Sequence, residues 1–277
     1  MVPEYGIGGV GAKHDRGWIV SIFIASPRDH VARMLHRPQE QGGRMPDIDI
    51  AGLEAIVLAT QDEARMQAYY ASRAPEYDRV YFKPERQADL QDIRRWLPTL
   101  FTGKSVLEVA CGTGYWTQYI APVASGMVAI DSSRETVQIA RTRVRPEEAE
   151  FVVGDAYRLP AAASGFQAAF AGFWFSHVPK DRIPEFLVNL HKALVPGAKV
   201  VFLDNRFVEG SSTPISERDE QGNTYQIRRL DDGSSHRVLK NFPSQADLRR
   251  AIEGIGAGFT FHEWKYYWAV EYAVAAP

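Results

Sequence analysis

One segment constrains the fold more than any other: residues 105–116, which read SVLEVACGTGYW. Its first half is apolar apart from Glu108 and predicts a short buried strand. Gly112 and Gly114 then form a tight turn, and from Trp116 onward apolar residues recur at helical spacing. Glycines let a backbone approach a ligand without an intervening Cβ. Because open α/β sheets bind nucleotides where a strand meets a glycine loop and a helix N-terminus, the segment predicts a nucleotide-type site.

The details of this loop separate it from other nucleotide-binding loops. It lacks the third glycine of a dinucleotide fingerprint and the lysine of a phosphate-binding P-loop. It resembles motif I of the class I S-adenosylmethionine (SAM) dependent methyltransferases, usually Asp/Glu-x-Gly-x-Gly-x-Gly, with alanine at the first glycine. A carboxylate suits SAM, which carries an ammonium and a sulfonium but no phosphate. An ordinary strand-turn-helix is the alternative. The resemblance implies that SAM is the cofactor and lies near Glu108, Ala110, Cys111, Gly112, Gly114 and Trp116.

Strand-like and helix-like patterns alternate after this loop, which predicts an α/β fold with helices on both faces of the sheet. Two more strands near the C-terminus would complete a Rossmann-like, seven-stranded, mostly parallel sheet. The expected later strands are 127–131, 150–153, 166–171, 198–203, 258–264 and 266–275.

Two aspartates follow successive strands of this pattern. Asp131, with Ser132 beside it, has the spacing of a ribose-binding acid, and the resemblance implies that its carboxylate accepts both ribose hydroxyls. The pair Asp155 and Ala156 resembles the adenine clamp of the same family. Each has a structural alternative, since an Asp or Ser at 131–133 can cap a helix and Asp155 suits an ordinary turn.

The loop after strand 166–171 reads GFWFSHVP, and the resemblance implies that it faces the transferable methyl group. It lacks the Asn/Asp-Pro-Pro-Tyr/Phe motif of enzymes that methylate DNA amino groups or protein glutamine. Phe173 could contact the sulfonium, and Trp174 and Phe175 suit a flat or apolar acceptor. His177 is a candidate general base, since its ordinary pKa of about 6.5 suits proton removal at neutral pH. Capping the next helix or hydrogen-bonding backbone is the alternative.

Two helical patterns, at 53–70 and 85–99, precede the first strand. The tyrosine-rich stretch between them resembles the N-terminal cap of small-molecule methyltransferases related to ubiquinone and menaquinone methyltransferases. That likeness implies Tyr77 and Tyr81 at the cofactor and Tyr70 at the substrate. Packing of aromatic side chains in the core is the alternative.

The segment after strand 198–203 reads Asp204-Asn205-Arg206. An Asp-Asn pair resembles the metal site of catechol-type O-methyltransferases, but the further carboxylate that would complete an oxygen cage is missing, so we expect no metal. Asn205 and Arg206 are then candidates for substrate contact. The polar insertion 207–242 predicts a β-hairpin lid around Asp231-Asp-Gly-Ser-Ser.

Composition excludes several classes of protein. A net charge of −2 and a pI near 6.4 leave no electrostatic footprint for nucleic acid. A single cysteine excludes an intrachain disulfide and fits a reducing compartment. No apolar run approaches the ~18 residues of a membrane span. We therefore expect a cytoplasmic monomer or homodimer.

We expect residues 1–44 to be a poorly ordered extension and 45–277 to be one methyltransferase domain. The expected reaction is methyl transfer by in-line displacement to O, N or C of a small aromatic or apolar metabolite, with S-adenosylhomocysteine released. A non-catalytic SAM-binding protein and an NAD(P)-dependent oxidoreductase are the alternatives. The domain divides into a helical cap (45–103), a SAM-binding core (104–206), the lid (207–242) and the end of the sheet (243–277).

Overall fold

The computed structural model describes residues 12–14, 17–19, 64–159 and 164–276. The chain divides into two units, Met1–Ile50 and Ala51–Pro277. In the first unit, β1 (Ala12–His14) and β2 (Gly17–Ile19) pair antiparallel. The rest of the expected extension 1–44, and the predicted helix before residue 64, lie outside the described residues.

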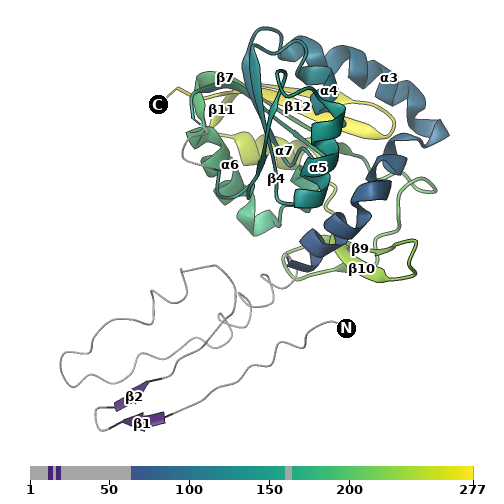
Figure 1. The fold of residues 1–277 in the computed structure, drawn as a ribbon, viewed down its shortest axis with the longest axis vertical. Coiled ribbons are helices and arrows are strands. Elements are labelled where there is room, and N and C mark those ends of the chain that lie inside the picture. Colours follow the sequence, from purple (N-terminus) through teal and green to yellow (C-terminus); the bar gives the residue numbers. More distant parts are fainter. Residues whose placement is uncertain (1–11, 15–16, 20–63, 160–163, 277) are drawn as a thin grey trace. The chain divides into compact units, whose positions relative to one another are not determined.

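The second unit is built on the predicted seven-stranded sheet, with the order β11-β12-β7-β6-β3-β4-β5 (Figure 1). The five strands from β7 to β5 are parallel. At one edge β12 runs antiparallel to β7, and β11 runs antiparallel to β12. The sheet strands are β3 (Ser105–Val109), β4 (Gly126–Asp131), β5 (Glu150–Val153), β6 (Phe166–Gly172), β7 (Leu194–Asn205), β11 (Gly256–Glu263) and β12 (Tyr267–Val274).

Helices cover both faces of the sheet, as the alternating pattern predicted. On β3, Val106 packs into the apolar layer beneath α3, α4 and α5, and Leu107 packs into the layer beneath α6 and α7. A strand buried on both faces reads as a continuous apolar run, which is how this one reads. The helices are α3 (Gln87–Trp96), α4 (Thr117–Ile120), α5 (Arg134–Arg143), α6 (Ile183–Lys192) and α7 (Gln245–Ile252).

The N-terminal cap consists of a helix at 64–73, followed by the 3-10 helix η1 (Ala74–Tyr81), η2 (Pro84–Arg86), α3 and η3 (Leu97–Leu100). The insertion forms the predicted hairpin from β9 (Thr224–Arg229) and β10 (Ser235–Leu239). The sequence did not predict its third strand, β8 (Glu217–Arg218).

One strand boundary differs from the sequence prediction by more than two residues. Val195-Pro-Gly197 reads as a helix terminator, yet β7 already begins at Leu194. Leu194 pairs with Phe166, and the pairing then shifts so that Lys199 opposes Ala168. Gly197 adopts a φ of +78° within this irregularity, which glycine tolerates. Within the described ranges, no helix combines the length and apolarity that crossing a membrane requires.

Candidate active site

Backbone strain gathers at the carboxyl ends of two adjacent strands. Among the described non-glycine residues, only Ala110 and Phe173 have positive φ, of 56° and 58°. Ala110 follows β3 and Phe173 follows β6, its neighbour in the sheet. A left-handed conformation costs an L-residue roughly 1–2 kcal/mol and is typical of functional loops.

The two loop glycines do different work. A Cβ on Gly114 would lie 3.0 Å from the Cβ of Ala140, so a side chain there would collide with α5. Among the described residues, a Cβ on Gly112 would meet only Tyr77, at 4.0 Å. The backbone at Gly112 therefore borders open space that the Tyr77 ring overlooks. Such a place admits a ligand close to bare backbone.

Asp131 lies against this loop, with one side of its carboxylate already used. Its Oδ2 accepts from the Gly112 N–H at 2.9 Å, and its Oδ1 accepts from the Ser133 N–H at 2.8 Å and the Thr136 hydroxyl at 3.0 Å. A carboxylate has about four acceptor positions, so the free one is on Oδ2. Ser133, rather than the exposed Ser132, caps α5. Burial raises the pKa of Asp131, although these hydrogen bonds oppose the shift.

The second aspartate lies at the next strand end. Asp155 follows β5, and the N–H of Gly154 donates to the Asp131 carbonyl at 2.9 Å, so the two aspartates belong to one edge of the sheet. Asp155 Oδ1 accepts from the Tyr157 N–H at 2.9 Å. Ala156, beside it, is buried.

The acid of the loop motif is beneath the loop rather than open to it. Glu108 is 2% exposed, and its Oε2 accepts from the Thr117 hydroxyl at 2.6 Å. Burial raises its pKa to about 8, so the carboxyl holds its proton at neutral pH. Burial also raises the pKa of the Cys111 thiol, which fits a packed side chain better than a reactive one. Trp116 is buried as well, and its indole N–H has no hydrogen-bond partner in the described part of the chain.

The cap contacts the glycine loop through Asp78, the residue after Tyr77. Asp78 accepts from the Thr113 hydroxyl at 2.6 Å and pairs with Arg143 of α5. This contact brings Tyr77 to its place beside Gly112. Tyr81, predicted at the cofactor, is 2% exposed and stacks on Tyr115 with ring centroids 3.4 Å apart, inside the apolar layer.

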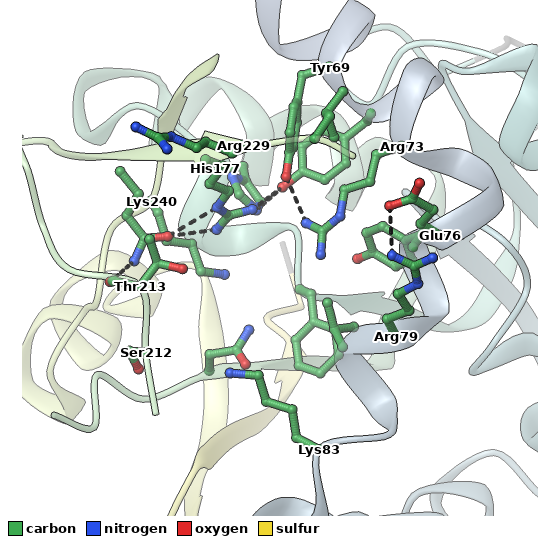
Figure 2. Close-up of a pocket in the computed structure, with 18 of the residues that line it drawn as sticks. Tyr69, Arg73, Glu76, Arg79, Lys83, His177, Ser212, Thr213, Arg229 and Lys240 are labelled. Atoms are coloured by element: carbon green, nitrogen blue, oxygen red, sulfur yellow. Dashed lines mark hydrogen bonds and ion pairs between the residues drawn. The ribbon is translucent and has the colours of Figure 1, made fainter. Parts of the chain in front are cut away.

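A cavity of about 390 Å³ lies between the cap, the end of β7 and the lid (Figure 2). The predicted residues that line it are Tyr70, Tyr77, Phe173, His177 and Asn205.

Three residues proposed for substrate contact lie elsewhere. Trp174 packs on Tyr157, and Phe175 packs on Phe202, because the turn after β6 directs both rings toward the opposite apolar layer. Arg206 pairs with Glu263 instead of lining the cavity.

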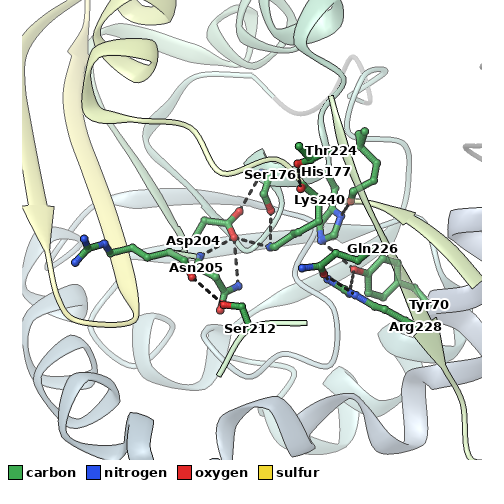
Figure 3. Close-up of polar contacts among 12 residues, drawn as sticks. Tyr70, Ser176, His177, Asp204, Asn205, Ser212, Thr224, Gln226, Arg228 and Lys240 are labelled. Carbon is green, nitrogen blue, oxygen red and sulfur yellow. Dashed lines mark hydrogen bonds and ion pairs between the residues drawn. The ribbon is translucent and has the colours of Figure 1, made fainter. Parts of the chain in front are cut away.

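His177 is held at both ring nitrogens (Figure 3). Its Nδ1 lies 2.5 Å from the Leu239 carbonyl and its Nε2 lies 2.9 Å from the Tyr70 hydroxyl. A carbonyl only accepts, so Nδ1 carries the hydrogen and Nε2 accepts from Tyr70. Burial, with the charges of Lys240 and Arg228, lowers the pKa of His177 well below its ordinary value. The ring is thus a neutral acceptor covered by a phenol. The backbone bond that the sequence offered as the alternative to a base is present.

A buried ion pair joins the lid to the sheet. Lys240, which follows β10, lies with its Nζ 2.8 Å from Asp204 Oδ1 and also donates to the Ser176 hydroxyl (Figure 3). Asp204 Oδ2 accepts from the Ser176 N–H at 3.0 Å. Asp204 is therefore engaged by a lysine, unlike the metal-binding acid that its sequence context resembles.

Sequence reasoning missed most of the cations that line the cavity. Arg73, Lys83 and Arg86 come from the cap, whose charged residues alternate with apolar ones as on any solvated helix face. Their position becomes visible only when the cap folds over the sheet. Arg228 of β9 was one of several polar lid residues with nothing to distinguish it.

The fold and the loop together define a class. The fold matches a solved structure that holds SAM, and the chain contains a class I SAM-dependent methyltransferase domain, for which SAM is the cofactor. Residues 106–197 match the family described as the methyltransferase domain.

Known proteins similar to this chain include one with bound ligands. The chain is 28% identical to DhpI, solved in complexes with SAH and with SAM and HEP; for the latter the TM-score is 0.64, over 76% of this chain and 97% of DhpI. Demethylmenaquinone methyltransferase of Lactococcus lactis subsp. lactis is 27% identical, over 52% of this chain and 59% of that protein. Malonyl-[acyl-carrier protein] O-methyltransferase of Pectobacterium atrosepticum is 24% identical, over 56% and 65%. The chain spans less than two thirds of these two curated relatives.

Proposed function

We propose that this protein is a cytoplasmic enzyme that transfers a methyl group from SAM to a small molecule bound in the cavity between cap and lid. One observation carries the proposal. Tyr77 both lines the cavity and overlooks the open space at Gly112, so the cofactor loop and the cavity share a wall. A cofactor bound at that loop and an acceptor in the cavity would therefore meet beside Tyr77 and Phe173.

The residues present fit SAM. The open backbone at Gly112 admits the nucleoside, Asp131 keeps a free acceptor position on Oδ2 for one ribose hydroxyl, and Asp155 is on the same edge for the adenine. Bound SAM supplies an activated methyl group on a positively charged sulfur. Because Glu108 is buried with its pKa raised to about 8, we assign it to supporting the loop from below.

The chain's own contribution to the reaction is positioning and exclusion of water. The cap closes over the loop through Asp78, and the lid is fixed to the sheet through Lys240. Holding reacting atoms in line at about 3–3.5 Å in a dry site can supply on the order of 7–11 kcal/mol of a barrier. His177 can take a proton only by way of Tyr70, whose hydroxyl occupies its free nitrogen.

Two relatives have names that state different acceptors, demethylmenaquinone and malonyl-[acyl-carrier protein], so the likeness supports methyl transfer and the cavity defines the acceptor. Tyr70, Tyr77 and Phe173 line the cavity, and these aromatic side chains support an aromatic acceptor. It gives no support to an apolar one, because Trp174 and Phe175 lie outside it. A SAM-binding protein without activity is the rival proposal, and an acceptor-sized cavity beside the cofactor loop argues against it.

The test is calorimetric titration with SAM. Gly112→Val and Asp131→Ala should abolish binding, because the first fills the open space and the second removes the acceptor. His177→Ala should leave binding intact and slow only turnover. Gly103→Val is the matched control: Gly103 also has positive φ, +70°, and no described residue lies within 4 Å of its Cβ position, but it precedes β3 and is outside the glycine loop. Equal SAM affinity in Gly112→Val and Gly103→Val would contradict the assignment of the loop.

A further inference from the structure

The cavity is lined by more positive charge than the residues around it neutralise. The two carboxylates that line it, Glu76 and Asp231, both pair with Arg79. Lys240 pairs with Asp204. Glu76 and Asp231 share the one guanidinium of Arg79, so this group keeps one uncompensated negative charge. The other lining cations outnumber it: Arg73, Lys83, Arg86, Arg228 and Arg229.

Two arginines on the wall beside the lid have only neutral partners. Arg73 donates to the Tyr69 hydroxyl at 2.8 Å, and Arg228 donates to the Gln226 side-chain oxygen at 2.8 Å and the Tyr70 hydroxyl at 3.1 Å. Within the ranges that the structure describes, neither guanidinium has a carboxylate within the 4.0 Å of an ion pair. Each guanidinium has five N–H donors, so both keep donors that these contacts leave unused.

Two further cations also have neutral hydrogen-bond partners. Lys83 donates to the Ser211 carbonyl at 2.7 Å, and Arg86 donates to Asn205 Oδ1 at 3.0 Å and to the Ser211 hydroxyl. Burial and the neighbouring Arg86 lower the pKa of Lys83, and the nearby Glu85 carboxylate opposes this shift. In Figure 2 the side chains of Arg73 and Lys83 are both directed into the cavity.

Uncompensated cations that share a partly buried cavity repel one another and lose hydration, so an anion entering the cavity is favoured electrostatically. Guanidinium groups match planar carboxylates and phosphoryl groups through paired N–H donors. The chain as a whole is slightly acidic, so the positive charge belongs to this cavity and is not a general property of the protein.

Resting on the proposed methyltransferase function, we propose that the acceptor molecule carries a compact oxyanion, a carboxylate or a phosphoryl group, held by Arg73 and Arg228 and attracted by Lys83 and Arg86. Tyr70 forms hydrogen bonds with both Arg228 and His177, and thereby fixes the orientation of the Arg228 guanidinium toward the bound anion. The oxyanion is an electrostatic handle that brings the acceptor to the wall shared with the cofactor loop.

The experiment has two stages, so that failure of the function and failure of this inference are distinguishable. Calorimetry with S-adenosylhomocysteine first tests the cofactor site and checks that each variant is folded. With S-adenosylhomocysteine bound, inorganic phosphate and acetate are then titrated at constant ionic strength into the wild type, Arg73→Gln, Arg228→Gln and Arg79→Gln. Arg79 lines the same cavity but is already paired, so its variant is the matched control.

We expect one of the two anions to bind the wild type and Arg79→Gln alike, and to bind Arg73→Gln and Arg228→Gln on the order of tenfold more weakly. Tighter binding of phosphate would assign a phosphoryl acceptor, and tighter binding of acetate a carboxylate. Normal binding of S-adenosylhomocysteine with no binding of either anion would overturn the inference and leave the methyltransferase proposal standing. Equal anion affinity in all four proteins would overturn it as well.

Discussion

Replacing the buried acid beneath the glycine loop by its neutral isostere, Glu108→Gln, should change how stability depends on pH. Burial raises the pKa of Glu108 to about 8, whereas an unfolded glutamate titrates near pH 4.3. Between these values the native state holds a proton that the unfolded state has released. The free energy of unfolding of the wild type therefore falls by about 1.4 kcal/mol for each pH unit as the pH rises from the unfolded to the folded pKa of Glu108.

Glutamine cannot titrate, so Glu108→Gln lacks this slope. The difference in free energy of unfolding, variant minus wild type, should rise by roughly 4 kcal/mol from about pH 5 to about pH 8. Urea denaturation followed by tryptophan fluorescence, without cofactor, measures it, and other titrating groups cancel in the difference. Glu150→Gln, at an exposed glutamate that begins β5, controls for the substitution itself. If the Glu108→Gln and wild-type curves stay parallel over this range, the carboxyl is not neutral in the native state and the reasoning fails.

Two other predictions concern stability. Lys240→Met should cost about 3–5 kcal/mol in urea denaturation, because it leaves Asp204 buried without its cation, and the double change with Asp204→Leu should recover part of the loss. No recovery would mean that the pair does not couple the lid to the sheet. Ala110→Gly should stabilise the protein by about 1 kcal/mol, since glycine adopts a φ of 56° without strain; a lower midpoint of unfolding would be evidence against that strain.

Sequence reasoning predicted the fold because periodicity and turn chemistry are local. A few neighbouring residues are enough to recognise each of three features: the apolar run that forms β3, the aspartate at the end of β4, and the hairpin of the lid. The same reasoning could not assign Trp174 and Phe175, because a chain turning out of a strand can direct an aromatic ring to either face. Phe173 has positive φ, and that single torsion sends the two following rings into the core. No residue pattern marks it.

The charge of the cavity was equally hidden from the sequence. Arg73 and Arg228 are more than 150 positions apart, and each is ordinary among its neighbours. Their shared lack of a carboxylate is a property of the folded chain, since it depends on which acids the folding brings near. The overall charge of −2 bears on nucleic acid as a partner and does not describe the charge of one cavity. An excess of positive charge in the cavity is compatible with a net negative charge of the chain, because only the lining side chains determine the charge of the cavity.

The contacts that hold the lid are unequal at its two ends. At one end, the buried ion pair of Lys240 with Asp204 holds the hairpin, and the Leu239 carbonyl contacts His177. At the tip, Asp231 pairs with Arg79, and both side chains are more than 60% exposed, so solvent screens this contact. We therefore expect the tip of the hairpin to separate from the cap more readily than the end at Lys240. Molecules would then enter and leave past Arg79 while His177 keeps its tautomer.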